Sequence, residues 1–487
     1  MTGDDGGKSA ATDTAPQAMI GRLRRDLGTL ESYAEMLGIL IGAGIFTVTS
    51  QAWRLTGPSV ILGYLILMPI VLATSVPYAA FLSTPLGREP GGEYTHISRT
   101  LGGYRIAFVG TWLKIISYVG ALAFLAAALA DYVIEFAGGR LQSATHRLPL
   151  AVGSLIFFYL VHAVGVRWFG RLQVAMCALL GVSLIVLVAP GLFAVRLENY
   201  QPFITNGLGG LAASLVLLFF SYAGFESLAQ TAGEVEGSTE RLPGVFLKGL
   251  IITAIIFVLM SVVAFGVLPG SQLQASNAPM AAVASVYLPL GAALFVTFGA
   301  IMAITTSINS TMLVPSRLAI ILARDGLAPR WIGTIHPRTG TPILGLTITL
   351  VAAIFLLISG QVSLALNIAV FALVILYFLH SLTFLLLKRR NPQLFSLIRI
   401  GLSPSVQRAA AWVSVLTMGG IIAIQVVQDI QTLATQSFQQ RLGGRSLTSL
   451  ELAIVWGLIG FILYVYGRSR LRPAKDREIA LSDSTGG

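Results

Sequence analysis

Charged residues are scarce in this sequence. Only 11% of its 487 residues are Asp, Glu, Lys or Arg, whereas 55% are hydrophobic and the mean hydropathy is +0.80. A soluble domain carries about 25% charged residues, and a chain this apolar cannot cover its surface in water. The scarcity therefore excludes a soluble globular protein and indicates an integral membrane protein.

Cysteine is almost absent as well, because Cys177 is the single one. One cysteine excludes an intramolecular disulfide. The sequence also has no phosphate-binding P-loop, no cluster of residues spaced to bind a metal and no nucleophile motif. We therefore expect neither ATP-driven transport nor an enzyme, and no cofactor other than Na⁺ or H⁺ as a coupling ion.

What the sequence does have is a series of long apolar runs. A membrane-spanning helix needs about 20 such residues, and no segment shows the alternating ten-residue pattern of a membrane β-barrel. The expected fold is all-α, with twelve transmembrane helices. They cover residues 33–56, 59–82, 104–136, 148–164, 172–195, 207–231, 244–268, 287–323, 341–359, 362–387, 409–427 and 450–466.

The basic residues predict how the helices are oriented. Residues 1–32 and 467–487 read as polar tails, and an even number of helices places both on one side of the membrane. If that side is the cytoplasm, 25 of the 32 Lys and Arg face it, as the positive-inside rule requires. We expect a multi-pass protein of a bacterial-type inner or plasma membrane with cytoplasmic termini. The net charge of +11 then reflects topology and does not call for nucleic acid.

Two of the predicted helices contain an interruption. The first carries GILIGAGIFTV at 38–48, with three glycines in seven residues, and the sixth carries FFSYAGFESLAQTAGEVEG at 219–237. Glycine in a membrane helix often serves close packing. Broken helices, however, are typical of transporters, where freed amides hold an anionic group and freed carbonyls hold cations. Two breaks, each in the first helix of a set of five, favour transport.

Five segments resemble the amino acid–polyamine–organocation (APC) superfamily. They are LGILIGAGIFTVTSQAWRLTGPSVILGYLI, PLGREPGGEYTHISRTLGG, GVRWFGRLQ, FFSYAGFESLAQTAGEVEG and SRLAIILARDGLAP, in that order along the chain. The resemblance implies the five-plus-five inverted repeat shared with sodium symporters of the LeuT type. The first repeat would cover 33–195 and the second 207–387, with two further helices over 409–466. It also implies an amino acid permease that works by alternating access.

The resemblance further implies where a substrate binds. Its α-carboxylate would lie on the backbone amides of Ala43 and Gly44, although many relatives have Ser or Thr where this chain has Ala43. Its α-ammonium would lie on carbonyls of both breaks, and the family's helix 6 lid corresponds to Phe220. The carbonyl positions are Leu40, Phe220, Ser221 and Ala223.

The side-chain pocket is implied at Gly120, Ala121 and Phe124, with Thr305 as a further candidate. These residues are small, apolar or neutral, which favours neutral amino acids over cationic ones. A polyamine or cationic amino acid carrier, a cation–chloride carrier and a non-transporting amino acid sensor remain alternatives.

Coupling is where the sequence departs from its relatives. Proton-coupled and exchanging members often carry a lysine in helix 5, and the matching residue here is Leu180. A sodium ion could instead bind the hydroxyls of Thr306 and Ser307 with the carbonyls of Gly38 and Ile41. Lys114 is the other candidate, because an intramembrane lysine is costly; its alternative is to snorkel to the cytoplasmic interface.

Other polar residues are expected to serve structure. His162 and His380 lie on separate predicted helices with no ligand-spaced partner, which favours packing. Asp131, with Glu135 one turn further, is expected at a solvated helix end. Glu226 and Glu234 are expected to bond backbone or hydroxyl groups that support the second break.

Overall fold

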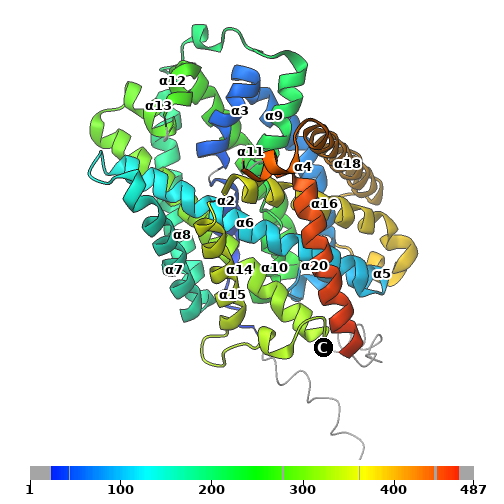
Figure 1. Cartoon of the computed structure of the whole chain (residues 1–487). Coiled ribbons are helices and arrows are strands. Elements are labelled where there is room, and N and C mark those ends of the chain that lie inside the picture. The colour runs from blue at the N-terminus through cyan, green and yellow to red at the C-terminus, as the bar shows by residue number, and fades with distance from the viewer. Residues whose placement is uncertain (1–22, 43, 277–278, 361, 444–446, 471–487) are drawn as a thin grey trace, which may run out of the picture.

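The computed structural model describes residues 23–470, except residues 43, 277–278, 361 and 444–446 (Figure 1). Within these residues the regular structure is helical, and the one β-type contact is an isolated bridge between Leu27 and Val235. In the described part of the chain, eleven helices are long and apolar enough to span a membrane. The chain is therefore an all-α, multi-pass membrane protein.

The twelfth predicted span is shorter than expected. Helix α15 (Ile343–Ile358) has 16 residues and falls below the length of the other eleven. At 1.5 Å per residue it is about 24 Å long. The prediction of twelve full-length spans is corrected to eleven, with α15 as a short apolar helix in the twelfth place.

The remaining helices follow the predicted order. The helix predicted at 104–136 matches its observed bounds, whereas the tenth and eleventh extend further than expected. The unbroken long helices are α4 (Val60–Leu82), α6 (Tyr104–Phe136), α7 (Ser143–Val164), α8 (Val166–Gly191), α11 (Ser238–Val267), α14 (Leu290–Arg324), α16 (Val362–Arg390), α18 (Pro404–Thr435) and α20 (Ser449–Arg470).

Proline and capping residues explain two of the shifted boundaries. The helix predicted from residue 287 begins at Leu290, because Pro289 is extended and ends the short helix α13 (Pro279–Tyr287). Helix α18 begins before the predicted residue 409. Ser403 caps it by accepting a hydrogen bond from Val406 N, with Pro404 in the first turn.

The first predicted span is broken into three pieces. Helix α2 (Thr29–Leu40) ends at the glycine-rich stretch, a π-helical turn η1 follows (Gly44–Val48), and α3 (Thr49–Thr56) completes the crossing. Before α2, Leu27 exchanges backbone hydrogen bonds with Glu234 and Glu236. The start of the first broken helix is thereby tied to the segment that follows the second break.

The sixth predicted span is broken as well. Helix α9 (Gly207–Tyr222) stops where Ala223 turns extended and Gly224 takes a φ of +108°. A side chain at residue 224 would be strained in that conformation. The short helix α10 (Ser227–Gln230) follows, and α11 begins at Ser238. Both interruptions predicted from glycine therefore exist in the backbone.

Helix α6 lies at the centre of the bundle and packs against α14 and α16. Its second half is rich in alanine, from Ala121 to Ala130, and these small side chains allow neighbouring helices to approach closely. Helix α18 lies at the edge of the bundle and α20 crosses the face nearest the viewer (Figure 1). The two C-terminal helices thus cover the outside of a core that contains both breaks.

Candidate functional site

Each glycine of the first break lies against a different neighbour. A Cβ on Gly38 would lie 2.3 Å from Gln173 Nε2, and one on Gly42 would lie 1.9 Å from Ser307 Oγ. A Cβ on Gly44 would lie 2.6 Å from the backbone Cα of Ser221. All three distances are too short for a side chain. The glycines therefore serve both the break and the close approach of α8, α14 and α9.

The two breaks enclose a small buried cavity of about 40 Å³. This is enough for a few waters and far below the roughly 300–1,000 Å³ of a typical ligand pocket. A cavity of this size does not hold an amino acid, so such a ligand can bind only if the lining moves. The residues around the cavity are Ile39, Leu40, Gly44, Ser117, Tyr118, Ala121, Leu125, Phe220, Ser221, Ala223, Gly224, Ser307, Thr311 and Leu373.

Six residues implied as substrate contacts line this cavity: Leu40, Gly44, Ala121, Phe220, Ser221 and Ala223. Ala43 lies outside the described residues. The other three implied residues do not line it. Gly120 is buried within α6, and the Thr305 hydroxyl donates to Met302 O at 2.9 Å.

Phe124 supports the implied lid instead of lining the cavity. Its ring makes a T-shaped contact with the ring of Phe220, with centroids 5.7 Å apart. Phe220 also packs with Val48 from the π-helical turn. The ring of Phe220 is therefore braced by α6 and by the far side of the first break.

Sequence reasoning missed several lining residues. Ser117 and Tyr118 lie one helical turn before Ala121 on the same face of α6, so the i, i+3 and i+4 spacing could have revealed them. Thr311 and Leu373 come from α14 and α16 and carry no comparable signal in the sequence.

The proposed sodium ligands lie together. The hydroxyls of Thr306 and Ser307 each lie 2.9 Å from Gly38 O, to which both donate. The other carbonyl within reach of Ser307 is Ile39 O at 3.2 Å, whereas Ile41 is the buried residue that follows α2. Leu180, at the position where the resemblance implies a lysine, is buried in α8.

Gln173 lies between these elements. Its Nε2 donates to Ala34 O of α2 at 3.1 Å and to Thr306 O of α14 at 3.3 Å, while its Oε1 accepts from Asn309 at 2.7 Å. A neutral carboxamide therefore joins α2, α8 and α14 beside the proposed sodium ligands.

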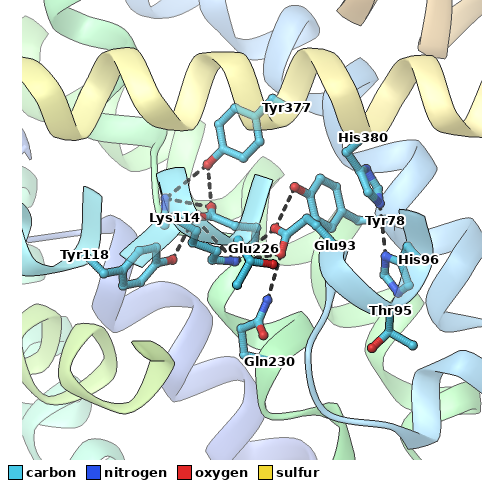
Figure 2. A network of polar contacts seen from close by, with 12 residues as sticks. Tyr78, Glu93, Thr95, His96, Lys114, Tyr118, Glu226, Gln230, Tyr377 and His380 are labelled. Atoms are coloured by element: carbon cyan, nitrogen blue, oxygen red, sulfur yellow. Dashed lines mark hydrogen bonds and ion pairs between the residues drawn. The ribbon is translucent and has the colours of Figure 1, made fainter. Parts of the chain in front are cut away.

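Lys114 does not snorkel to the interface. Its side chain is 1% exposed, and its Nζ lies 2.9 Å from Glu93 Oε2 and 4.0 Å from Glu226 Oε1 (Figure 2). Glu93 begins the short helix α5 (Glu93–Leu101), which precedes α6. Folding brings the Glu93 carboxylate to the Lys114 ammonium and neutralises its charge. The lysine side chain therefore does not need to reach water.

Glu93 is held by four donor contacts. Both of its oxygens lie within 3.0 Å of Lys114 Nζ, Tyr78 donates to Oε1 at 2.7 Å and Gln230 donates to Oε2 at 2.7 Å. Burial raises the pKa of Glu93, whereas the charge of Lys114 opposes that rise. The Glu93 carboxylate thus accepts hydrogen bonds from α4, from α6 and from the segment after the second break.

Glu226 connects the network to the second break. Its Oε1 accepts from Tyr118 at 2.7 Å, and its Oε2 accepts from Gly224 N at 3.0 Å and from Tyr377 (Figure 2). The expected backbone support of the break by Glu226 is confirmed. Because Tyr118 also lines the cavity, the network around Lys114 lies directly behind the candidate site.

His380 has a partner that the sequence does not reveal. Its Nε2 lies 3.0 Å from Nδ1 of His96, which belongs to α5. Burial, and secondarily the charge of Lys114, lowers the pKa of His96 to about 3. His380 packs in the interior as expected, stacked on Tyr78 with ring centroids 3.9 Å apart, and only its pairing with His96 was not foreseen. His162 packs as expected, stacked on Phe169, with Nε2 2.8 Å from Asn309 O.

Two further ion pairs differ in burial. Glu234 pairs with Arg317 at 2.7 Å and both are 1% exposed. This corrects the expectation that Glu234 bonds only backbone or hydroxyl groups. Asp131 pairs with Arg147 at 2.6 Å, with 35% and 45% of their side chains exposed, in agreement with a solvated helix end.

The match to known families decides the class of protein. A family model described as amino acid permease matches residues 27–438. The chain belongs to this family. Its relatives are transporters and not enzymes, and this permease is likewise a membrane transporter.

Three curated relatives show the range of substrates in the family. The branched-chain amino acid permease BcaP of Bacillus subtilis is 27% identical over 336 residues, which is 66% of this chain and 71% of that one. The methylthioribose transporter of the same organism is 25% identical over 405 residues, 79% of this permease and 86% of the relative. The chloroplastic cationic amino acid transporter 9 of Arabidopsis thaliana is 27% identical over 346 residues, 67% of this chain and 60% of that one.

Proposed function

We propose that this permease is a secondary active transporter that moves neutral α-amino acids across the membrane by alternating access. The observation that carries the proposal is the meeting of two broken helices at one buried cavity. A zwitterion needs hydrogen-bond donors at one end and acceptors at the other. Amides at the start of η1 supply donors, and carbonyls at the ends of α2 and α9 supply acceptors.

The assignment of binding roles follows the same chemistry. The α-carboxylate lies on the amides of residues 43 and 44, and the α-ammonium on the carbonyls of Leu40, Phe220, Ser221 and Ala223. In support, Gly44 and Ser221 are close enough to leave no room for a Cβ. A ligand of amino acid size can then reach both breaks at once.

The preference for neutral side chains rests on the lining. None of the described residues that line the cavity is acidic. The nearest carboxylate in the network, Glu226, already accepts hydrogen bonds from Tyr118, Tyr377 and Gly224 N. A branched-chain permease among the relatives supports the same class. Cationic amino acids, polyamines, methylthioribose and chloride salts are the competing ligands to test.

We propose that protons drive the transport. Lys114 Nζ lies within 4.0 Å of two buried carboxylates, Glu93 and Glu226. Two carboxylates and one ammonium leave an excess negative charge in an apolar interior, where an unbalanced charge is costly. Binding of one proton removes the excess. Because Glu226 holds Gly224 N, a proton there also changes the support of the second break.

The overall arrangement is part of the proposal. The five spans from α2/α3 to α8 and the five from α9/α10 to α16 form inverted repeats, in support of which each set begins with a broken helix. Both termini are cytoplasmic in a bacterial-type inner membrane, in agreement with the distribution of basic residues.

The test of the substrate is binding followed by uptake. Purified permease is screened by thermal stabilisation against the twenty amino acids and the competing ligands, and the hits are then used for uptake into proteoliposomes. We expect saturable uptake of a neutral amino acid. Stabilisation without uptake would indicate a sensor, and selective stabilisation by arginine, lysine or spermidine would overturn the neutral class.

The test of coupling compares gradients in liposomes without internal substrate. We expect uptake with an inward proton gradient and no sodium, and its loss in Lys114→Met but not in the control Lys248→Met, whose side chain is exposed. Uptake that follows a sodium gradient, and that is weakened by Thr306→Ala and Ser307→Ala, would overturn the proton proposal. Uptake that needs internal amino acid would indicate an exchanger.

A further inference from the structure

A second, larger hollow lies on the opposite face of α6 from the candidate site. It is a groove of about 2000 Å³ bounded by α6, α14, α15 and α20. Ser117, Tyr118 and Ala121 of α6 face the small cavity, whereas Phe108, Trp112 and Val119 face this groove. One helix therefore forms a wall of both, and the groove is separate from the substrate site.

The walls of the groove are apolar over the depth of one leaflet. On α6 its lining extends from Tyr104 to Val119, which is about 22 Å along a helix. Half of a typical hydrocarbon core is about 15 Å. On α15 the lining includes Ile348 and Phe355, which are 46% and 74% exposed. The groove thus opens toward the lipid that surrounds the bundle.

One end of the groove is basic. Arg105 at the start of α6, Arg324 at the end of α14 and Arg330 in the turn η6 (Arg330–Gly333) line this mouth, and all three are exposed. Among the described residues, no acidic side chain forms an ion pair with any of them within 4.0 Å. The mouth is therefore a site of uncompensated positive charge.

The carboxylates near the mouth are already engaged or set back. Asp325 accepts a hydrogen bond from Tyr94 at 2.7 Å and pairs with Arg99 at 3.4 Å. Burial raises the pKa of Glu89, whereas the charges of Arg99 and Arg324 oppose that rise. Two carboxylates, Asp325 and Glu89, thus face four arginines (Arg99, Arg105, Arg324 and Arg330), and the charge at the mouth remains net positive.

Aromatic residues mark the depth of the mouth. Trp331 and Tyr466 are 58% and 54% exposed and lie in the lining at the same end as the arginines. Exposed Trp and Tyr side chains are typical of the membrane–water interface. The arginines thus lie at the level of lipid headgroups, and the apolar walls extend from there toward the middle of the membrane.

We propose that this groove is a binding site for an anionic phospholipid, with the phosphate headgroup on Arg105, Arg324 and Arg330 and the acyl chains along α6 and α15. Basic pockets between membrane helices bind acidic headgroups in this way. The occupant stabilises the position of α6 between the groove and the network of Lys114. It therefore modulates transport without contacting the substrate.

The first experiment compares lipids on the wild-type permease. The protein is reconstituted in nanodiscs of phosphatidylcholine alone or with phosphatidylglycerol or cardiolipin, and its thermal unfolding and retained lipids are measured by calorimetry and native mass spectrometry. We expect anionic lipid to be retained and to raise the unfolding temperature, and soluble glycerol phosphate to have no effect. Equal retention and stabilisation by phosphatidylcholine would overturn the proposal.

The second experiment removes the site. Arg105→Gln, Arg324→Gln and Arg330→Gln are combined, with the matched control Arg54→Gln, Arg140→Gln and Arg196→Gln, three arginines that are also exposed. We expect about a hundredfold weaker retention of anionic lipid in the first triple variant and unchanged retention in the control. Ala352→Trp, which fills the apolar part, should reduce retention with all charges intact. If both the first triple variant and Ala352→Trp retained anionic lipid as the wild type does, the proposed lipid site would be overturned.

Discussion

Lys114 of α6 and Glu93 of α5 form a buried ion pair, with Nζ and Oε2 2.9 Å apart and the side chains 1% and 2% exposed. The pair joins α6, which lines the candidate cavity, to the short helix that precedes it. Removing one partner of such a pair leaves an uncompensated charge in an apolar interior.

Lys114→Met is therefore expected to destabilise the permease by about 3–5 kcal/mol. The double variant Lys114→Met/Glu93→Gln should recover part of this loss, because one buried carboxylate, Glu226, then lacks a cation instead of two. Thermal unfolding in detergent measures both, with Lys248→Met as control. Unfolding of the double variant at a lower temperature than the single would show that the charge balance is not what stabilises this region.

The two ion pairs Glu234–Arg317 and Asp131–Arg147 provide a matched test of burial. Their N–O distances are 2.7 and 2.6 Å, but the first pair is 1% exposed and the second 35–45%. We expect Glu234→Gln to cost about 3–5 kcal/mol, and Asp131→Asn about 0–1 kcal/mol. Denaturation of the purified variants measures their free energies of unfolding. Similar losses in the two variants would contradict the expected effect of burial.

Gly44→Ala is expected to impair both folding and substrate binding, because its Cβ would lie 2.6 Å from the backbone of Ser221. The control is Gly181→Ala in α8, where a Cβ meets open space. There the higher helix propensity of alanine should preserve or raise stability by up to about 1 kcal/mol. If Gly44→Ala bound substrate at wild-type affinity, the close contact between Gly44 and Ser221 would not be needed for binding. The substrate assignment would then lose its basis.

Phe220→Ala is expected to reduce the uptake rate more than it reduces stability. Phe220 lines the cavity and is braced by Phe124, so its loss leaves the cavity without its aromatic cover. Phe193→Ala is a suitable control, since that ring is 94% exposed. Phe220→Trp should keep part of the uptake. Wild-type uptake by Phe220→Ala would assign closure to another residue.

Much of the fold could be predicted from the sequence. Residues 104–136 were recognisable as one helix because the apolar run is continuous and longer than a membrane is thick. Both breaks were recognisable because Gly42, Gly44 and Gly224 interrupt such runs where a helix former would be expected. Ends of helices were less predictable, since Ser403 and Pro404 extend α18 beyond its apolar part.

Side-chain partners were much less predictable. Lys114 and Glu93 are 21 residues apart, Glu226 and Tyr377 are 151 apart, and His96 and His380 are 284 apart. The spacing of residues along one helix reveals its faces but not which residue of another helix lies opposite. For that reason the interface position expected for Lys114 was wrong, while the support of the break by Glu226, only two residues from Gly224, was foreseen.

The sequence by itself determined that the chain lies in a membrane, how its helices follow one another and where two of them break. These properties depend on local composition, since transfer of apolar residues from water and the helix propensity of glycine act within a single segment. Tertiary structure alone decided that the breaks enclose one cavity and that Lys114 is neutralised by Glu93 and Glu226. A buried charge is stable only beside its partners, and folding alone brings those partners together.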